Sequence, residues 1–274
     1  MKLTAWLVPS AVAFCAIAIA ASAQELIPGK IYVAEIAGGV SYTVGGSPSG
    51  LRKGLTLPVQ GARNETAPSA HVVYVYSNGT SLYVDEKTVI QIARFMQVPF
   101  PKGTDTTVNE PSVSHTLGRI SKGRIIITTN KLATGTTMLY MTPHAVVKVR
   151  GKEVVIEVYD RESRIYVITG EVTVTPGNGS GMNPGQVLHT GEMLTVTDSD
   201  ASSGSSVPLL VLAIDPGWLA SIAGQLAAGE RAQQIVVFET VPGADGPEIQ
   251  ANPVVPANPP INLTVSPSTL RTGG

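Results

Sequence analysis

Residues 142–160 combine the alternation of a β-strand with a break in its phase, and this break limits the folds open to the chain. Side chains alternate faces along a strand, so apolar residues of one parity share one face. The apolar positions are odd up to Val149 and even from Val154 onward. One regular strand cannot change phase, and glycine tolerates the backbone angles of a sharp bend. We therefore expect a bulge or tight turn at Arg150-Gly151-Lys152.

The rest of the chain also favours a mainly β fold. A charged turn at residues 160–164 leads into a second β-rich run, Ile165–Val174. Short runs rich in β-branched and aromatic residues, separated by turns rich in glycine, proline and serine, are typical of many short strands. The polar, proline-interrupted stretch 97–116 is expected to be a surface loop. Further strands are predicted at 31–36, 39–44, 51–57, 72–76, 81–84, 88–95, 123–129 and 192–197.

An Asn-Gly pair at residues 78–79 predicts a hairpin between two of these strands. Asn-Gly favours the type I′ turn, whose twist matches that of paired strands. Tyr74, Tyr76 and Tyr83 cluster at this hairpin. Tyrosines at alternate strand positions are often half-buried cross-strand partners, whereas an exposed cluster would form a contact surface for a partner. We keep them as candidate contacts, together with the basic turn residues Arg150 and Lys152.

The amino terminus predicts export. An uncharged apolar stretch follows Lys2 and closes on Ala21-Ser22-Ala23, the small-x-small pattern that signal peptidases recognise. We expect residues 1–23 to be a signal peptide, and no later apolar run of about 20 residues predicts a stable membrane span after cleavage. Cys15 is the only cysteine and lies within the predicted signal, so the mature chain would hold neither disulfides nor a reactive thiol.

The composition argues against several classes of function. Lys and Arg number 19 against 20 Asp and Glu, and no basic block occurs, so a nucleic-acid partner is not expected. The four histidines are dispersed without metal-ligand spacing (His71, His115, His144 and His189). Paired carboxylates such as Asp85-Glu86 fall in predicted turns. We therefore expect no catalytic residues, no metal and no cofactor, and hence no enzyme.

The C-terminal part of the sequence is predicted to consist of a helix-containing extension, residues 208–240, followed by a tail. Residues 208–240 contain one predicted helix near 216–229, which Pro216 suits as a helix start. Its apolar residues Trp218, Leu219, Ile222 and Leu226 recur at helical spacing and predict docking onto the β-domain. Residues 235–238 could add an edge strand. From 241 to 274 prolines are frequent and large apolar side chains are few, so a disordered proline-rich tail is expected.

Between about residues 31 and 197 the order of these features resembles the FecR-type domain. Each element is short, and their order carries the resemblance. The matching elements are the 39–44 strand, the Leu51-x-x-Gly54 step, the 77–84 hairpin, Thr142-Pro143-x-Ala145, Val149-Arg150-Gly151, the 166–174 strand and the Pro184-Gly185-Gln186 turn. The resemblance implies a solenoid-like or roll-like β-domain, here assigned to residues 31–200.

The regulators that name this family carry a cytoplasmic sigma-factor-binding region and a membrane helix ahead of the domain, where this chain has a predicted signal peptide. The resemblance therefore implies the periplasmic module of bacteria without its signalling region. Two functions follow. The first is a non-catalytic, exported protein-interaction or scaffold module, periplasmic or secreted to the cell surface, whose partner is an envelope or outer-membrane protein. The second is a carbohydrate- or polymer-binding β-domain with exposed aromatic platforms.

Overall fold

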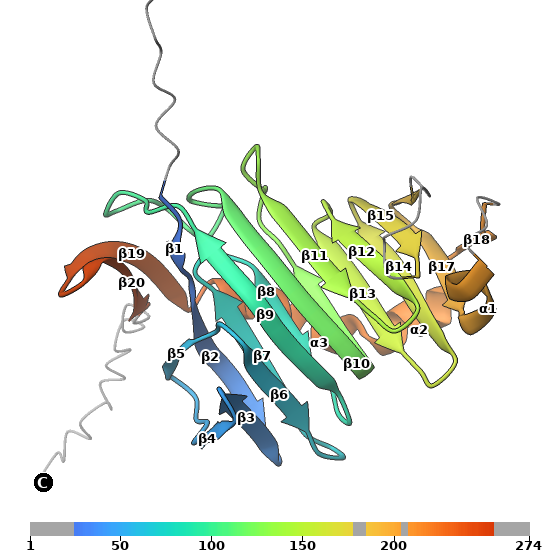
Figure 1. Ribbon diagram of the computed structural model, residues 1–274, viewed down its shortest axis with the longest axis horizontal. Coiled ribbons are helices and arrows are strands. Elements are labelled where there is room, and N and C mark those ends of the chain that lie inside the picture. Colours follow the sequence, from blue (N-terminus) through green and yellow to red (C-terminus); the bar gives the residue numbers. More distant parts are fainter. Residues whose placement is uncertain (1–24, 178–184, 204–207, 255–274) are drawn as a thin grey trace, which may run out of the picture.

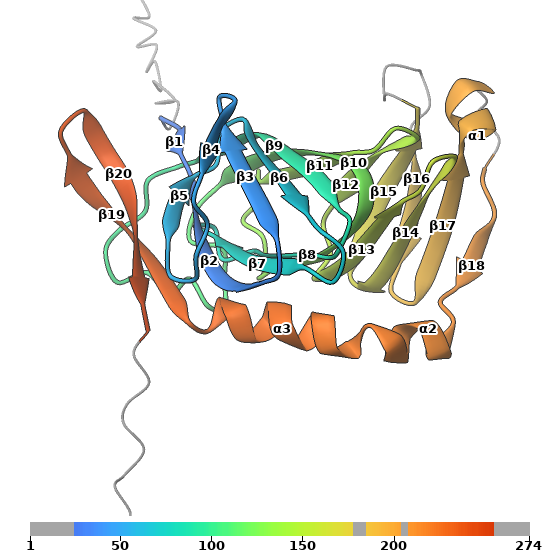
Figure 2. The ribbon, with the colours of Figure 1, turned by 90° about the horizontal axis from the view of Figure 1, so that it is seen from below.

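The computed structural model describes residues 25–177, 185–203 and 208–254 (Figure 1). Two β-sheets lie face to face, and most successive pairs of strands alternate between them along the chain (Figure 2). The expected mainly β, roll-like architecture is confirmed. The signal peptide predicted over residues 1–23 lies outside the described residues.

Among the described residues, no helix lies on the outer face of one sheet, which is named here the uncovered sheet (Figure 2). Its neighbours pair antiparallel except for β10 and β11, which run parallel. In spatial order it contains β4 (Ser47–Ser49), β3 (Val40–Val44), β6 (Ala62–Thr66), β9 (Val89–Gln97), the first half of β10 (Ser114–Thr128), β11 (Thr137–Met141), β12 (Ala145–Val149), β15 (Glu171–Pro176) and β16 (Gln186–His189), with β1 (Ile27–Pro28) beside the end of β9.

The other sheet is named the covered sheet because α3 lies across its outer face (Figure 2). Strand β10 belongs to both sheets, since its second half, from Gly123, pairs with β8 and β13. In spatial order the covered sheet contains β5 (Thr56–Pro58), β2 (Lys30–Ala37), β7 (His71–Tyr76), β8 (Ser81–Val84), β10, β13 (Glu153–Val158), β14 (Glu162–Thr169), β17 (Glu192–Thr197) and β18 (Val211–Ala213).

The phase break predicted at Arg150-Gly151-Lys152 is confirmed, and its cause is a change of sheet. Strand β12 ends at Val149 in the uncovered sheet, and β13 begins at Glu153 in the covered one. Val149 and Val154 both point into the space between the sheets and are fully buried. The apolar parity must therefore shift, because the chain turns a corner between two sheets that face each other.

Two apolar clusters hold the layers together. The larger cluster fills the space between the sheets, and the smaller lies between the covered sheet and the C-terminal segment. Neighbouring residues of β13 belong to different clusters. Val154 and Ile156 point into the larger cluster between the sheets, and Val155 points outward into the smaller cluster beside the helices. A strand that is buried on both faces reads as a continuous apolar run, which explains the Val-Val-Ile sequence of β13.

The predicted helix is present and is divided in two: α2 (Pro216–Ser221) and α3 (Ala223–Gln233) meet at Ile222. Asp215 caps α2, because its Oδ1 accepts a hydrogen bond of 2.7 Å from the Trp218 amide. Ile222 is fully buried against the covered sheet, so the predicted docking face is confirmed. A short helix, α1 (Asp198–Ser203), was not predicted. In the described residues, no helix has the length and apolar content to cross a membrane.

The prediction of a disordered tail from residue 241 onward is wrong for residues 241–253, which belong to a β-hairpin. Strand β19 (Val236–Gly243) pairs antiparallel with β20 (Gly246–Pro253), and Phe238 and Ile249 are buried in the smaller apolar cluster. This hairpin forms its own two-stranded sheet, so the edge strand expected at 235–238 does not join the main sheets. Residues 255–274 lie outside the described residues.

The Asn78-Gly79 hairpin is confirmed, but its turn type is not. Gly79 has a positive φ of 84°, whereas Asn78 does not, so the residues do not form a type I′ turn. The Gly79 amide donates to the Tyr76 carbonyl at 2.8 Å, and the Tyr76 amide donates to the Thr80 carbonyl at 2.8 Å. This pattern is a type I turn closed by a left-handed glycine, the common three-residue hairpin loop.

Candidate functional site

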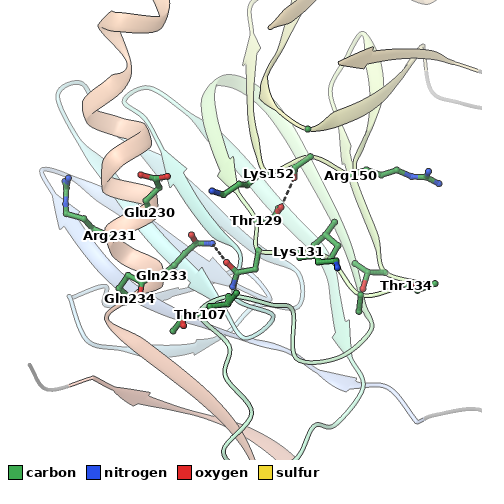
Figure 3. A pocket seen from close by; sticks show the side chains of 18 residues that line it. Thr107, Thr129, Lys131, Thr134, Arg150, Lys152, Glu230, Arg231, Gln233 and Gln234 are labelled. Carbon is green, nitrogen blue, oxygen red and sulfur yellow. Dashed lines mark hydrogen bonds between the residues drawn. The ribbon is translucent and has the colours of Figure 1, made fainter. Parts of the chain in front are cut away.

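A cleft of about 1170 Å³ opens where the end of α3 passes the turns that connect the two sheets (Figure 3). It is named here the crossing groove. Its walls are the β10–β11 loop (residues 129–136), the β12–β13 crossing (Arg150, Gly151 and Lys152) with Gly170, the end of α3 (Glu230, Arg231, Gln233 and Gln234), and Thr107 with Val108.

Hydrogen bonds fix the backbone of this groove. Thr129 joins the β10–β11 loop to the crossing, because its amide donates to the Lys152 carbonyl at 2.7 Å and its hydroxyl donates to the Gly151 carbonyl at 2.6 Å. Gln233 joins α3 to the same region, since its Nε2 donates to the Gly79 carbonyl at 2.7 Å and to the Thr128 carbonyl at 3.0 Å. Segments far apart in the chain are therefore tied into one rigid frame.

The Glu110 carboxyl anchors the β10–β11 loop through hydrogen bonds. Its Oε2 accepts from the Ala133 amide and from the Thr136 hydroxyl, both at 2.6 Å. Its Oε1 accepts from the Ser114 hydroxyl at 2.6 Å and from Asn78 Nδ2 at 3.3 Å. Burial raises the pKa of Glu110, although these hydrogen bonds act in the opposite direction. The stretch 97–116, predicted as a surface loop, thus also contributes a buried structural carboxyl.

The groove is rich in positive charge. Lys131, Arg150 and Lys152 are exposed on its walls, and Figure 3 shows Lys152 pointing toward α3 and Arg150 pointing away from it. Arg150 Nη1 lies 3.9 Å from Glu171 Oε1, and both side chains are largely exposed. Within the described ranges, no carboxylate lies within 4.0 Å of Lys131 or Lys152. Such weakly paired surface charges are available to a ligand.

The predicted contact residues divide into two groups. Arg150 and Lys152 stand together in the groove wall, whereas the tyrosines lie in the apolar clusters. Tyr74 and Tyr76 are 3% and 2% exposed between the sheets, and Tyr83 is 7% exposed on the opposite face of the covered sheet. Rings this deeply buried cannot contact a partner of the folded domain, so that prediction is wrong for all three tyrosines.

Each buried tyrosine has a structural role. The Tyr74 hydroxyl accepts a hydrogen bond of 2.5 Å from Asn64 Nδ2, and the Tyr76 ring meets Phe95 edge to face with centroids 5.1 Å apart. Tyr83 stacks on His71 with centroids 5.3 Å apart. Burial is the main cause that raises the pKa of Tyr83 to about 12. Sequence reasoning missed both reasons for burial: the facing sheet encloses Tyr74 and Tyr76, and the C-terminal segment covers the other face of the sheet, where Tyr83 lies.

Sequence reasoning also missed Lys131 and the end of α3 as parts of the groove. Lys131 is separated from Lys152 by a whole strand pair, and Gln233 comes from a helix about 80 residues further on. No local pattern connects these positions. The phase change that predicted a bulge or tight turn at Gly151 was the only sequence signal for this region.

His144 lies beside a serine and an aspartate, as a catalytic histidine can, but its hydrogen bonds here have a structural role. His144 Nδ1 lies 2.8 Å from Ser163 Oγ, and its Nε2 lies 3.1 Å from Asp198 Oδ1. The Ser163 hydroxyl donates to Thr142 Oγ1 at 2.9 Å. His144 is 1% exposed and Ser163 is completely buried, so a substrate cannot reach this hydroxyl. The network fastens the Thr142 turn to β14.

A second cleft is lined by the turns at 85–87 and 159–162. Its central cation, Arg124, is paired with carboxylates of the same cleft. The Arg124 guanidinium donates to Glu157 Oε1 at 2.7 Å and to Asp85 Oδ2 at 3.2 Å. Tyr159 and Tyr166 donate to Glu157 Oε2 at 3.0 and 3.1 Å. Because Glu157 is 2% exposed and fully hydrogen-bonded, this cluster acts as an internal ion-pair network.

In the part of the chain that the structure describes, no three metal-ligating side chains gather at one point.

Comparison with solved structures finds a distant structural resemblance. No family model matches the chain, and no curated protein matches it. Two crystal structures of a candidate anti-sigma factor from Parabacteroides distasonis each align with a TM-score of 0.41 and 17% sequence identity. Each alignment covers 58% of this chain and 63% of the other, so this chain spans less than two thirds of the length of that protein.

Proposed function

We propose that this chain is a non-catalytic, exported protein-interaction or scaffold module of the bacterial envelope, similar to the periplasmic part of FecR-type proteins. The observation that carries the proposal is the crossing groove, where Arg150 and Lys152 stand exposed on a backbone that is hydrogen-bonded on both sides. A rigid, charged and accessible cleft on a β-scaffold suits recognition of another molecule.

The distribution of reactive groups supports a non-catalytic role. A general acid, base or nucleophile must reach a substrate in a concave site. Here the buried Glu110 and Glu157 are occupied by internal donors, and His144 is enclosed beside Ser163. The groove itself presents lysine, arginine, threonine and amide side chains with the single carboxylate of Glu230.

The alternative of a carbohydrate-binding domain loses the feature that suggested it. Sugar rings stack on exposed aromatic faces, and the Tyr74, Tyr76 and Tyr83 rings are buried. Among the residues that the structure describes, none of those lining the crossing groove is aromatic. Recognition of a protein partner is therefore the function that we propose.

Capture from the bacterial envelope tests this function. The full chain, including the predicted signal peptide and carrying a C-terminal affinity tag, would be expressed and cross-linked in envelope fractions, and its partners identified by mass spectrometry. We expect one envelope protein to be enriched with the folded domain and lost with a destabilised Gly170→Ala variant. Turnover of a substrate by the purified protein, or equal recovery with both forms, would contradict the proposal.

A further inference from the structure

We propose that the crossing groove binds an acidic, extended peptide segment of the partner protein, an inference that rests on the proposed function and adds the chemistry of the ligand. The first observation is where the charge lies. The whole chain is almost balanced, with 19 basic and 20 acidic residues. The described residues that line the groove nevertheless include four cations, Lys131, Arg150, Lys152 and Arg231, against the one carboxylate of Glu230. A concave surface lined mainly by one sign of charge attracts the opposite sign.

The second observation is that these cations are weakly paired on a fixed backbone. Among the described residues, Lys131 and Lys152 have no carboxylate within 4.0 Å, and Arg150 has only the exposed ion pair with Glu171 at 3.9 Å. The Arg150 amide donates to the Glu171 carbonyl at 3.0 Å, and the Lys152 amide donates to the Thr169 carbonyl at 2.9 Å. These bonds fix the backbone, while the charged ends extend into solvent. A partner therefore gains ion pairs without having to order the loop, and such preorganisation favours binding.

The size of the groove points to a chain rather than a single small anion. Its volume of about 1170 Å³ exceeds the roughly 300–1,000 Å³ of ordinary small-molecule pockets. Lys131 comes from the β10–β11 loop and Lys152 from the β12–β13 crossing, so the charges belong to separate elements along the cleft. An extended segment with several carboxylates can meet them in turn.

The lining favours a peptide over a phosphate polymer or a polysaccharide. Phosphate groups are commonly bound by free backbone amides at nests and helix N-termini. Here the amides of Thr129, Arg150 and Lys152 already donate to carbonyls. Val108, which is 62% exposed, and the partly buried Leu132 both line the groove, so apolar side chains of a peptide would find contacts. With no ring to stack on, a sugar polymer would gain little.

Fluorescence anisotropy with a fluorescein-labelled peptide of alternating Glu and Val tests the inference, with a Gln-Val peptide as the ligand control. We expect the acidic peptide alone to bind. Raising the salt from about 0.01 to about 0.1 M shortens the Debye length from about 30 to about 10 Å and should weaken this binding. Arg150→Glu combined with Lys152→Glu should raise Kd at least about tenfold, since like charges would then face the ligand.

Lys87→Glu combined with Arg161→Glu is the matched control, because it makes the same change of charge in the second cleft. We expect it to leave Kd within about twofold of the unmodified chain, and circular dichroism should confirm that both double variants remain folded. An equal loss in the two double variants would assign the effect to net charge and overturn the inference. Absence of binding by the acidic peptide would also overturn it.

Inorganic polyphosphate and heparin serve as competitors. If either displaces the peptide at a lower concentration of anionic groups than the unlabelled acidic peptide does, the occupant is a phosphate or sugar polymer and the inference fails. Envelope capture separates this failure from failure of the proposed function. A partner retained equally by the native chain and by the Arg150→Glu/Lys152→Glu variant would leave the interaction module intact while removing the groove as its site.

Discussion

Gly151 and Gly170 lie backbone against backbone where two neighbouring chain segments cross between the sheets. A Cβ atom on Gly170 would come closer than 3.0 Å to Gly151 Cα and to Lys152 N, a distance that real Cβ atoms do not show. Gly170 also has a positive φ of 108°. Both features require glycine at position 170. A side chain there would clash with the backbone of the neighbouring segment, and a positive φ is unfavourable for residues that have a Cβ. This contact sets the position of the groove residues Arg150 and Lys152.

Replacing Gly170 should therefore destabilise the fold. We expect Gly170→Ala to lower the free energy of unfolding by about 2–4 kcal/mol, as strain at positive φ adds to the steric clash. Gly191→Ala is the control, since Gly191 has a φ of 84° but no atom within 4 Å of the place that a Cβ would take; its cost should be about 1–2 kcal/mol. Denaturant unfolding measures both. Equal costs would show that the crossing can relax.

Removing the buried carboxyl beneath the groove should loosen the β10–β11 loop. Glu110→Ala leaves the Ala133 amide and the Thr136 and Ser114 hydroxyls without their acceptor. We expect a loss of about 2–4 kcal/mol in the free energy of unfolding. Hydrogen exchange should show faster exchange at residues 129–136 than in the native chain. Unchanged protection of this loop would refute the supporting role of Glu110.

The same carboxyl predicts a pH dependence. Because burial raises the pKa of Glu110, the folded state holds its proton more tightly than the unfolded state. The resulting stabilisation is present below the unfolded pKa, about 4.3, and is lost as pH rises through the higher folded pKa. Glu110→Gln should remove this decline from the plot of unfolding free energy against pH. Glu65→Gln, at an exposed carboxylate, should leave it in place.

Truncating the core tyrosines should unfold the domain rather than impair binding alone. Tyr74→Ala and Tyr76→Ala each remove a ring that is at most 3% exposed, and each should cost about 3–5 kcal/mol. Tyr159→Ala removes a ring that is 46% exposed and should cost less. Thermal unfolding followed by circular dichroism orders the three variants. A native melting curve for Tyr76→Ala would contradict its place in the core.

Docking of α3 on the covered sheet should depend on Gly229. A Cβ at Gly229 would lie 2.9 Å from Ser81 Oγ and 3.0 Å from Thr128 Oγ1, whereas Gly224 has open space around it. Trp218 stacks on Tyr166 with centroids 3.8 Å apart, so its fluorescence reports on docking. In the chain from Gln24 onward, Gly229→Leu should shift the emission to longer wavelength, and Gly224→Leu should not. The same emission from both variants would contradict close packing at Gly229.

Export remains a prediction of the sequence. We expect mass spectrometry of the protein from its native envelope to find a chain that begins at Gln24, because Ala21-Ser22-Ala23 suits signal peptidase. Ala23→Arg should block the small-residue pocket and leave the precursor uncleaved, whereas Ala23→Gly should not. A full-length native protein in the cytosol would refute the prediction.

Local sequence patterns were sufficient for several elements of the fold. The phase change across Gly151 predicted a bulge or tight turn where β12 ends and β13 begins, and Asn78-Gly79 predicted the β7–β8 hairpin. The spacing of Trp218, Leu219 and Ile222 predicted the docked helix. Each of these features depends on residues within a few positions of one another, so side-chain period and turn chemistry determine them directly.

Burial of the tyrosines and assembly of the groove depended on contacts between distant segments. Tyr74 and Tyr83 are enclosed because the covered sheet packs against the other sheet on one face and against α3 on the other. Lys131 and Lys152 share a groove with Gln233 only because strand crossings and the returning helix bring three separate segments together. Sequence alone determined many of the strands and the turn at Gly151, whereas β6, β11 and β20 were not predicted. The tertiary structure decided which side chains are buried, because burial depends on what the folded chain places against each face.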